Sequence, residues 1–231
     1  MSVLHVLSGG AAQGLVESLR TTFESETGHR IDGTFGAVGA IRDKLLAGAP
    51  ADLLILTAAV ITGLERDGHV VSGSAKDIGE VQTAIAVRHG DPAPPVGSAD
   101  ALRSALLAAD AIHLPDPTQA TAGIHFAKVM RDLGIADQVA ARLQPAPNGA
   151  TAMRALAASK SARPIGCTQV TEILATAGLD LVAPLPPGCA LSTTYTVAIA
   201  RRAVARDAAA RLVAMLTDES GRARRQALGF V

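Results

Sequence analysis

Aromatic side chains and net charge are both scarce in this sequence of 231 residues. It has no tryptophan, one tyrosine and four phenylalanines, so we expect no platform for stacking sugars or bases. Lysine plus arginine equals aspartate plus glutamate at 21 each, which leaves no net charge. The chain therefore has no electrostatic reason to bind nucleic acid. An anionic ligand must be held by local dipoles and a few hydrogen-bond donors.

Long apolar runs are also missing. None approaches the roughly 20 residues that a helix needs to cross a bilayer, so we expect no membrane insertion. The first seven residues contain no basic stretch, no long apolar segment and no small-residue cleavage site. As it stands, the sequence predicts a cytoplasmic protein. It predicts a periplasmic one if a signal peptide has been removed.

Established cofactor and metal motifs are absent from the sequence. Cys167 and Cys189 form no CxxC pair and have no histidine at ligand spacing, which favours packed thiols over a disulfide or a catalytic role. Ser8-Gly9-Gly10 lacks the GxGxxG spacing, and there is no Walker A, GxSxG or HExxH sequence. We therefore expect neither a cofactor nor a metal.

Apolar runs suited to strands alternate with segments whose apolar residues recur at helical spacing. This alternation predicts an α/β fold with mostly parallel sheets and helices on both faces. Hydrophobic residues make up 48% of the chain, which is enough for a sizeable core. We expect strands at residues 3–7, 31–35, 53–56, 81–87, 111–114, 164–167 and 193–200. Helices are expected around 12–23, 41–46, 60–64, 122–133, 150–158, 170–177 and in the last thirty residues.

The length suits two lobes of about 100 residues. A proline-rich turn at 91–95 follows a strand-like segment, and we place the crossing between lobes near it. The predicted first lobe comprises residues 1–83 and 194–231, the second comprises residues 84–193, and the ligand cleft lies between them.

Five junctions between an expected strand and the next helix contain small residues and hydroxyls with few charges. Ligands of open α/β sheets bind beyond the carboxyl ends of the strands, where helix N-termini offer N–H groups. Ordinary turns and N-caps favour the same residues, but five such junctions together favour an anion site. Arg42 either reaches a ligand carboxylate or lies on the surface. The predicted ligand-binding residues are Ser8, Gly9, Gly10, Ala11, Gly36, Ala37, Val38, Gly39, Arg42, Thr57, Thr118, Thr121, Ala122, Asn148, Gly149, Thr168 and Gln169.

Three segments of the chain match a known family. They are Leu46–Leu53 (LAGAPADL), then Asp116-Pro117 with Ala122-Gly123-Ile124 and Ala127, and the closing Ala227–Phe230. In their order and spacing the chain resembles the molybdate-binding solute receptors of ABC importers, which have a type II periplasmic-binding-protein fold. The resemblance implies two lobes that close on a small anionic ligand. It also implies an ABC importer permease as a partner if the protein is exported.

The sequence departs from this family where the ligand would bind. The molybdate receptors present a serine in the first loop, another in the second and a tyrosine in a late loop. The matching positions here hold Ala11, the stretch 37–39 (Ala-Val-Gly) and Gln169. Three lost donors would cost several kcal/mol at about 1.5–3 kcal/mol each. The remaining polar side chains favour a di- or tricarboxylate over molybdate.

An enzyme is the alternative to a pure binding protein. Aconitate isomerase resembles the same receptor family, so the resemblance also implies that such a fold can carry catalysis. An isomerase of this kind would move a proton across an allylic system, which requires a carboxylate clamp and a base tuned towards neutrality. The candidates are the loop 168–172, Arg42 and one of His113, His125 or Asp116. Binding alone and isomerisation both stay open.

Overall fold

The structure is a computed structural model that describes residues 2–231. The chain divides into two compact units, called here the first unit (the chain up to Val81, with Thr193–Val231) and the second unit (Gln82–Ser192). The lobe boundaries expected from the sequence differ from these by two residues or fewer. Closure of the lobes on a ligand stays a prediction. No helix within residues 2–231 is both long enough and apolar enough to cross a membrane.

Three parallel strands of the first unit end at a common edge. Strand β1 (Ser2–Gly9) pairs in parallel with β2 (His29–Gly36) on one side and with β3 (Leu53–Thr57) on the other. Strand β9 (Ser192–Ile199) pairs antiparallel with β3. The register sets Gly9 opposite Gly36 and Ser8 opposite Ile55, so the carboxyl ends of β1, β2 and β3 lie together. The continuous apolar run of β3 is buried, as expected for a strand covered on both faces.

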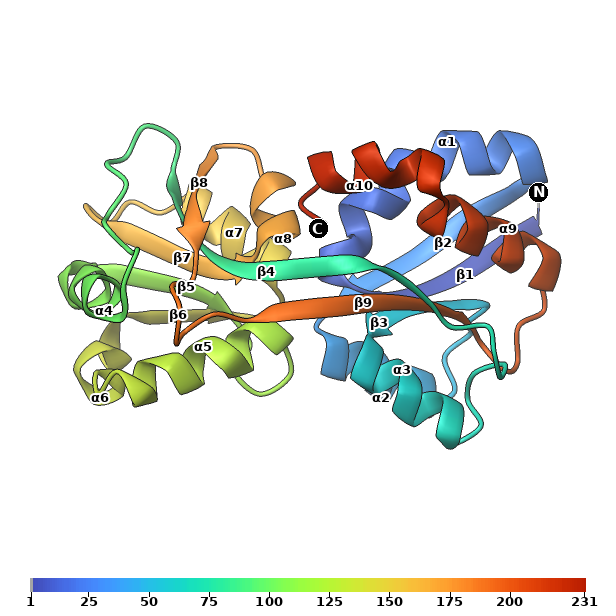
Figure 1. The fold of residues 1–231 in the computed structure, drawn as a ribbon, viewed down its shortest axis with the longest axis horizontal. Coiled ribbons are helices and arrows are strands. Elements are labelled where there is room, and N and C mark those ends of the chain that lie inside the picture. Colours follow the sequence, from blue (N-terminus) through green and yellow to red (C-terminus); the bar gives the residue numbers. More distant parts are fainter. Residues whose placement is uncertain (1) are drawn as a thin grey trace. The chain divides into compact units, whose positions relative to one another are not determined.

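Helices cover both faces of this sheet. Figure 1 shows α1, α9 and α10 on one side of β1 and β2, and α2 and α3 on the other. The buried residues of α1 include Leu15, Leu19 and Phe23, which recur at helical spacing. Short 3-10 turns precede α1 and α10. The helices are α1 (Gln13–Thr27), α2 (Val38–Leu46), α3 (Ala58–Arg66), α9 (Arg206–Thr217) and α10 (Arg222–Ala227).

Strand β4 (Lys76–Arg88) begins in the first unit and continues in the second. Its Glu80 exchanges two backbone hydrogen bonds of 2.9 Å with Val231. A Cβ on Gly79 would lie 3.3 Å from the Cβ of Phe230, so the closing segment packs tightly against this strand. Phe230 is therefore part of the core of the first unit.

The second unit repeats the arrangement of parallel strands. Strand β5 (Ala111–Pro115) pairs in parallel with β6 (Leu143–Ala146) and β7 (Pro164–Gln169), while β4 pairs antiparallel with β7 and β8 (Leu179–Pro184). Pro115 lies opposite Ala146, and His113 lies opposite Gly166. The carboxyl ends of β5, β6 and β7 therefore share an edge.

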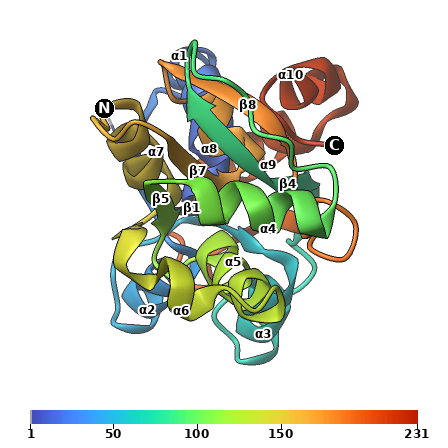
Figure 2. The same ribbon diagram turned by 90° about the vertical axis from the view of Figure 1, so that its left-hand side faces the viewer.

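Figure 2 shows α5 and α6 on one face of this second sheet and α7 and α8 on the other. The helices are α4 (Ala99–Ala108), α5 (Thr121–Asp132), α6 (Ala136–Val139), α7 (Gly149–Ala157) and α8 (Val170–Leu174). The core contains Phe126 and both cysteines, which are free and buried. The elements α4, α6, β6 and β8 are not predicted by the sequence pattern, and α8 is three residues shorter than expected. The predicted α/β class and the helices on both faces are confirmed.

Candidate functional site

Each unit gathers its share of the predicted residues at the edge where its parallel strands end. We call these the first edge and the second edge. At the first edge, residues 8–11 end β1 and open the next segment, residues 36–39 follow β2, and Thr57 ends β3. At the second edge, Thr118, Thr121 and Ala122 follow β5, Asn148 and Gly149 follow β6, and Thr168 and Gln169 end β7. Whether these residues bind a ligand stays a prediction.

Three helices begin at the first edge without a capping side chain. Their N-cap residues are Ala12 for α1, Ala37 for α2 and Thr57 for α3, and none makes a side-chain capping bond in the described chain. The first N–H groups of a helix lack partners within it and carry a partial positive charge. Ser8 is fully buried, and its hydroxyl donates to the carbonyl oxygen of Gly9 at 2.9 Å. The first edge thus offers mainly backbone dipoles.

Gly9 and Arg42 differ in their surroundings at this edge: Gly9 is closely packed, and Arg42 is partly exposed to solvent. A Cβ on Gly9 would lie 3.2 Å from both a ring carbon of Tyr195 and a methyl of Val38, so any larger residue would require these side chains to shift. Arg42, in contrast, donates to the Asp43 carboxylate at 2.8 and 3.0 Å, and both side chains are about half exposed. Its guanidinium is engaged on the surface of α2 rather than by the other predicted residues.

Asp116 organises the turn at the start of the second edge. Its Oδ1 accepts from the backbone N–H and the hydroxyl of Thr118, each at 2.7 Å, and from the N–H of Gln119 at 3.1 Å. These bonds, that of the Thr118 hydroxyl first, hold the pKa of Asp116 below its usual value. A carboxylate held ionised in this way is a poor base near neutral pH. The N-cap of α5, Ala120, again makes no side-chain capping bond.

A buried carboxyl group lies at the start of α7. The Thr168 hydroxyl donates to Oε2 of Glu172 at 2.6 Å, and the backbone N–H groups of Ala150 and Gln169 donate to the same carboxyl group. Burial raises the pKa of Glu172, and these three hydrogen bonds oppose the rise. A Cβ on Gly149 would overlap Glu172 Oε2 and Thr168 Oγ1. Glycine at this position is therefore what lets the carboxyl group lie against the helix start.

Asn148 adds a cap to the same helix. Its side-chain oxygen accepts from the N–H of Thr151 at 2.9 Å. The start of α7 thus carries both an amide cap and a carboxyl group of the protein. The sequence analysis included Glu172 only as the end of a candidate loop. Its burial against a glycine 23 positions earlier has no signal in the local sequence.

Of the two histidines proposed as bases, His113 is buried and His125 is half-buried. His113 is buried within β5, and neither ring nitrogen has a hydrogen-bond partner in the part of the chain described. Burial lowers its pKa, so the ring is neutral at physiological pH. Nε2 of His125 lies 2.8 Å from the carbonyl oxygen of Cys189 and ties α5 to the segment that follows β8. Glu172 is therefore the better-placed group for holding a proton at the second edge.

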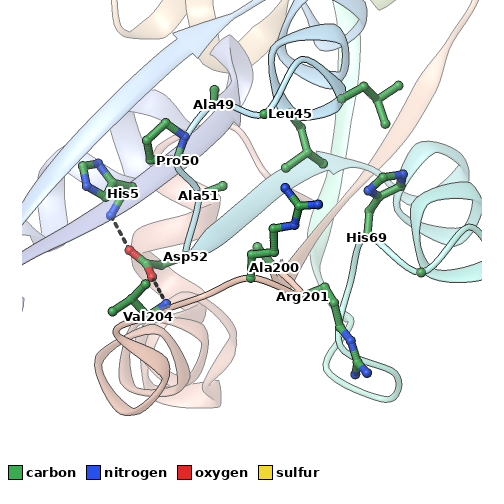
Figure 3. Close-up of a pocket in the computed structure, with 14 residues that line it drawn as sticks. His5, Leu45, Ala49, Pro50, Ala51, Asp52, His69, Ala200, Arg201 and Val204 are labelled. Carbon is green, nitrogen blue, oxygen red and sulfur yellow. Dashed lines mark hydrogen bonds between the residues drawn. The ribbon is translucent and has the colours of Figure 1, made fainter.

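The LAGAPADL segment lies away from the first edge. It lines a pocket of about 430 Å³ at the opposite end of β3, in which His5 and His69 lie on opposite walls (Figure 3). Oδ2 of Asp52 accepts from the N–H of His5 at 2.9 Å, and Oδ1 accepts from those of Val204 and Ala205 at 2.7 and 3.0 Å. Asp52 thus joins β1, the start of β3 and the segment before α9. This most specific of the family-like segments has a structural role.

No metal-binding cluster is apparent in the described residues, since no three or more His, Cys, Asp or Glu side chains there lie in a suitable group. The first edge therefore offers helix starts and neutral polar side chains, and the second edge adds the carboxyl group of Glu172.

Sequence comparisons relate nearly the whole chain to known proteins. Residues 4–231 match the family model described as bacterial extracellular solute-binding protein. The chain is 27% identical to an aconitate isomerase of Pseudomonas sp. over 228 residues, covering 95% of this chain and 84% of the relative. It is 22% identical to the molybdate-binding protein ModA of Escherichia coli strain K12 over 200 residues, covering 85% of this chain and 76% of ModA. The family resemblance expected from the sequence is confirmed.

Structural comparisons give the same fold. The periplasmic molybdate-binding protein of Azotobacter vinelandii superposes with a TM-score of 0.81 at 18% identity, covering 99% of this chain and 98% of that one. The sulfate-binding protein SubI of Mycobacterium tuberculosis H37Rv gives a TM-score of 0.78 at 15% identity, covering 100% and 86%. At such identities the likeness shows the fold alone. The predicted periplasmic-binding-protein fold is confirmed.

Proposed function

Because the chain belongs to the bacterial extracellular solute-binding protein family, we propose that it captures a small di- or tricarboxylate at its two loop-bearing edges. The observation that carries this proposal is the set of four helix starts without a capping side chain, those of α1, α2, α3 and α5. Free N–H groups at helix starts bind carboxylates and oxyanions without a compensating positive side chain. Such an arrangement suits a chain with no net charge.

The neutral donors at the two edges favour carboxylates over molybdate. Ala11 and the stretch 37–39 stand where the molybdate receptors have hydroxyls, and Gln169 stands where they have a tyrosine. Ser8, the remaining serine near the first loop, is buried and donates to Gly9. A tetrahedral oxyanion needs several donors at fixed distances, whereas a longer carboxylate can use widely spaced helix starts.

The partner and the location follow from the family as part of the same proposal. A solute-binding protein of an importer works outside the cytoplasmic membrane and delivers its ligand to a permease. We propose an ABC permease as the partner if the protein is exported. Fractionation of cells that express the native gene would decide between a periplasmic receptor and a cytoplasmic protein.

A thermal-shift panel tests the proposed ligand class. It would compare molybdate, tungstate, sulfate and phosphate with citrate, cis- and trans-aconitate and short dicarboxylates. A ligand at about 100 times its Kd adds roughly 2.7 kcal/mol, which raises Tm by about 5–10 °C for a chain of this size. Shifts with carboxylates and none with metal oxyanions are expected. A shift with molybdate or tungstate alone would overturn the carboxylate assignment.

A second candidate function is isomerisation of an unsaturated tricarboxylate. The 27% identity with aconitate isomerase across 95% of the chain favours it, as does a buried carboxyl group at the second edge. A base would take a proton from one carbon of the allylic system, the double bond would shift by one position, and a proton would return at the far carbon. Proton NMR of cis- and trans-aconitate incubated with the protein tests this. An unchanged spectrum would leave binding alone.

A further inference from the structure

The start of α7 differs from the other helix starts at the two edges. Glu172 lies against it with 7% of its surface exposed and accepts from the N–H of Ala150 in the first turn. The helices α1, α2, α3 and α5 have no side-chain capping bond in the described chain. An anion that approaches α7 therefore meets a negative charge of the protein whenever Glu172 is ionised.

Packing prevents this carboxyl group from moving away. A Cβ on Gly149 would overlap Oε2 of Glu172, which means that the carboxyl group touches the backbone of the helix start. Thr168, which donates to the same oxygen at 2.6 Å, is fully buried. A swing of the side chain into solvent would break these contacts. The property of Glu172 that can change without rearrangement is its proton.

The surrounding hydrogen bonds suit either protonation state. When Glu172 is ionised, the Thr168 hydroxyl donates to it, as do the N–H groups of Ala150 and Gln169. When Glu172 is protonated, its O–H can donate to Thr168 Oγ1, because a hydroxyl is both donor and acceptor. The hydrogen bond between Glu172 and Thr168 can therefore form in either state.

The charged groups of the neighbouring elements are occupied elsewhere. Helix α7 contributes Arg154, whose guanidinium donates to Thr151 at 3.0 Å. Strand β8 contributes Asp180, which pairs with His89 at 2.9 Å, and β7 contributes the buried thiol of Cys167. None of these groups is among the causes of the shift in the pKa of Glu172, which burial raises. The proton on Glu172 therefore responds mainly to burial and to any anion at α7.

We propose that Glu172 is a proton-controlled counter-charge: the start of α7 accepts a carboxylate ligand when Glu172 is protonated and repels it when Glu172 is ionised. The proton comes from solvent and returns to it on release of the ligand. This inference rests on the proposed function of anion capture, and it makes Glu172 a specificity-determining residue of the second edge. Protonation and binding are linked, so each favours the other.

Calorimetric titrations with citrate and trans-aconitate between about pH 5 and pH 9 test the proposal. They compare wild type with Glu172→Gln, which is an uncharged mimic of the protonated acid. Titration of the ligand itself affects both proteins alike. The Kd of wild type divided by that of the variant should be near one at the acid end and rise to about tenfold or more at the alkaline end, the size of a like-charge repulsion at short range. Glu219→Gln removes the same charge from an exposed site in the first unit and should leave the Kd within about twofold.

The possible outcomes distinguish failure of the proposed role of Glu172 from failure of the proposed carboxylate binding. Clear binding with a Kd ratio that stays constant across the pH range would overturn the role of Glu172 alone. Absence of binding by wild type to either probe at every pH would overturn the proposed function together with the inference. If the variant fails to fold, titrations of wild type in two buffers of different ionisation heat count the protons taken up on binding. No uptake beyond that of the ligand at any pH would then overturn the proposal.

Discussion

Each unit buries one acidic side chain beside the start of a helix, and the two carboxyl groups differ in their donors. Asp52, 3% exposed, accepts from three backbone N–H groups, those of His5, Val204 and Ala205. Glu172, 7% exposed, accepts from two backbone N–H groups and from a hydroxyl, that of Thr168. The first lies at the end of β3 away from its edge, and the second lies at the edge itself.

The difference lies in the chemical type of the donors. A backbone N–H can donate but not accept, and all three of these donors to Asp52 are of this kind. The Thr168 hydroxyl can reverse its role and accept from a protonated Glu172. Burial at a helix start is thus common to both carboxyl groups, and the hydroxyl donor distinguishes Glu172.

The largest effect is expected when Asp52 is removed. Asp52→Ala leaves three backbone N–H groups without their acceptor, which should lower the free energy of unfolding by about 3–4 kcal/mol. Asp52→Asn retains one accepting oxygen and should lose about half as much. Urea denaturation measures both. A loss below about 1 kcal/mol for the alanine variant would show that solvent in the pocket replaces the carboxylate.

The next effect tests the packing of Glu172 against α7. In Gly149→Ala the new methyl would overlap Glu172 Oε2 and Thr168 Oγ1, so we expect a loss of about 2 kcal/mol despite the better helix propensity of alanine. Gly63→Ala in α3 is the matched control. A Cβ there meets no atom within 4 Å, and the variant should gain up to about 1 kcal/mol. Equal effects of the two substitutions in urea denaturation would contradict the close contact at Gly149.

The same comparison explains how far the sequence alone could lead. The parallel strands and their edges follow from local patterns, such as the continuous apolar run of β3 and the helical spacing of Leu15, Leu19 and Phe23. Helix α4 has an N-cap residue, Ser98, but the helix is not predicted because it follows a proline-rich stretch that is typical of a loop. Strand β6 has only four residues, and neither β6 nor β8 contains a buried residue, so neither shows the pattern of a buried strand.

The electrostatics of the site could not be predicted because they arise between distant segments. Asp52 belongs to the segment that resembles the family most closely, yet its partners come from β1 and from residues about 150 positions later. Glu172 reads locally as an ordinary acidic residue in the first turn of a helix. Its carboxyl group packs against Gly149 and accepts from the Thr168 hydroxyl. A single sequence shows none of these contacts.

The pH dependence of the free energy of unfolding tests the comparison of the two buried carboxyl groups through a smaller effect, that of Glu172. Burial gives Glu172 a higher pKa in the folded chain than in the unfolded one. The contribution of Glu172 to the free energy of unfolding is therefore fully present below its pKa in the unfolded chain. It is lost as the pH rises through its pKa in the folded chain. The unfolding free energy of Glu172→Gln minus that of wild type should increase over this range. Thr168→Val removes a hydrogen bond that lowers the pKa, so the decline should extend to higher pH. Parallel pH profiles of wild type and the glutamine variant would contradict the raised pKa.

The smallest effect concerns Asp116, a half-buried residue whose carboxylate orders the turn at the second edge. Its hydrogen bonds to Thr118 and Gln119 lower its pKa, so its contribution is present above the unfolded pKa and is lost as the pH falls through the folded pKa. Asp116→Ala should lower the unfolding free energy by about 0.5–1 kcal/mol at neutral pH, because solvent replaces most of the bonds. The deficit should disappear in acid, which is opposite in direction to the trend for Glu172. Urea denaturation at neutral and acid pH measures both. A deficit that persists in acid would mean that Asp116 acts through packing rather than through its charge.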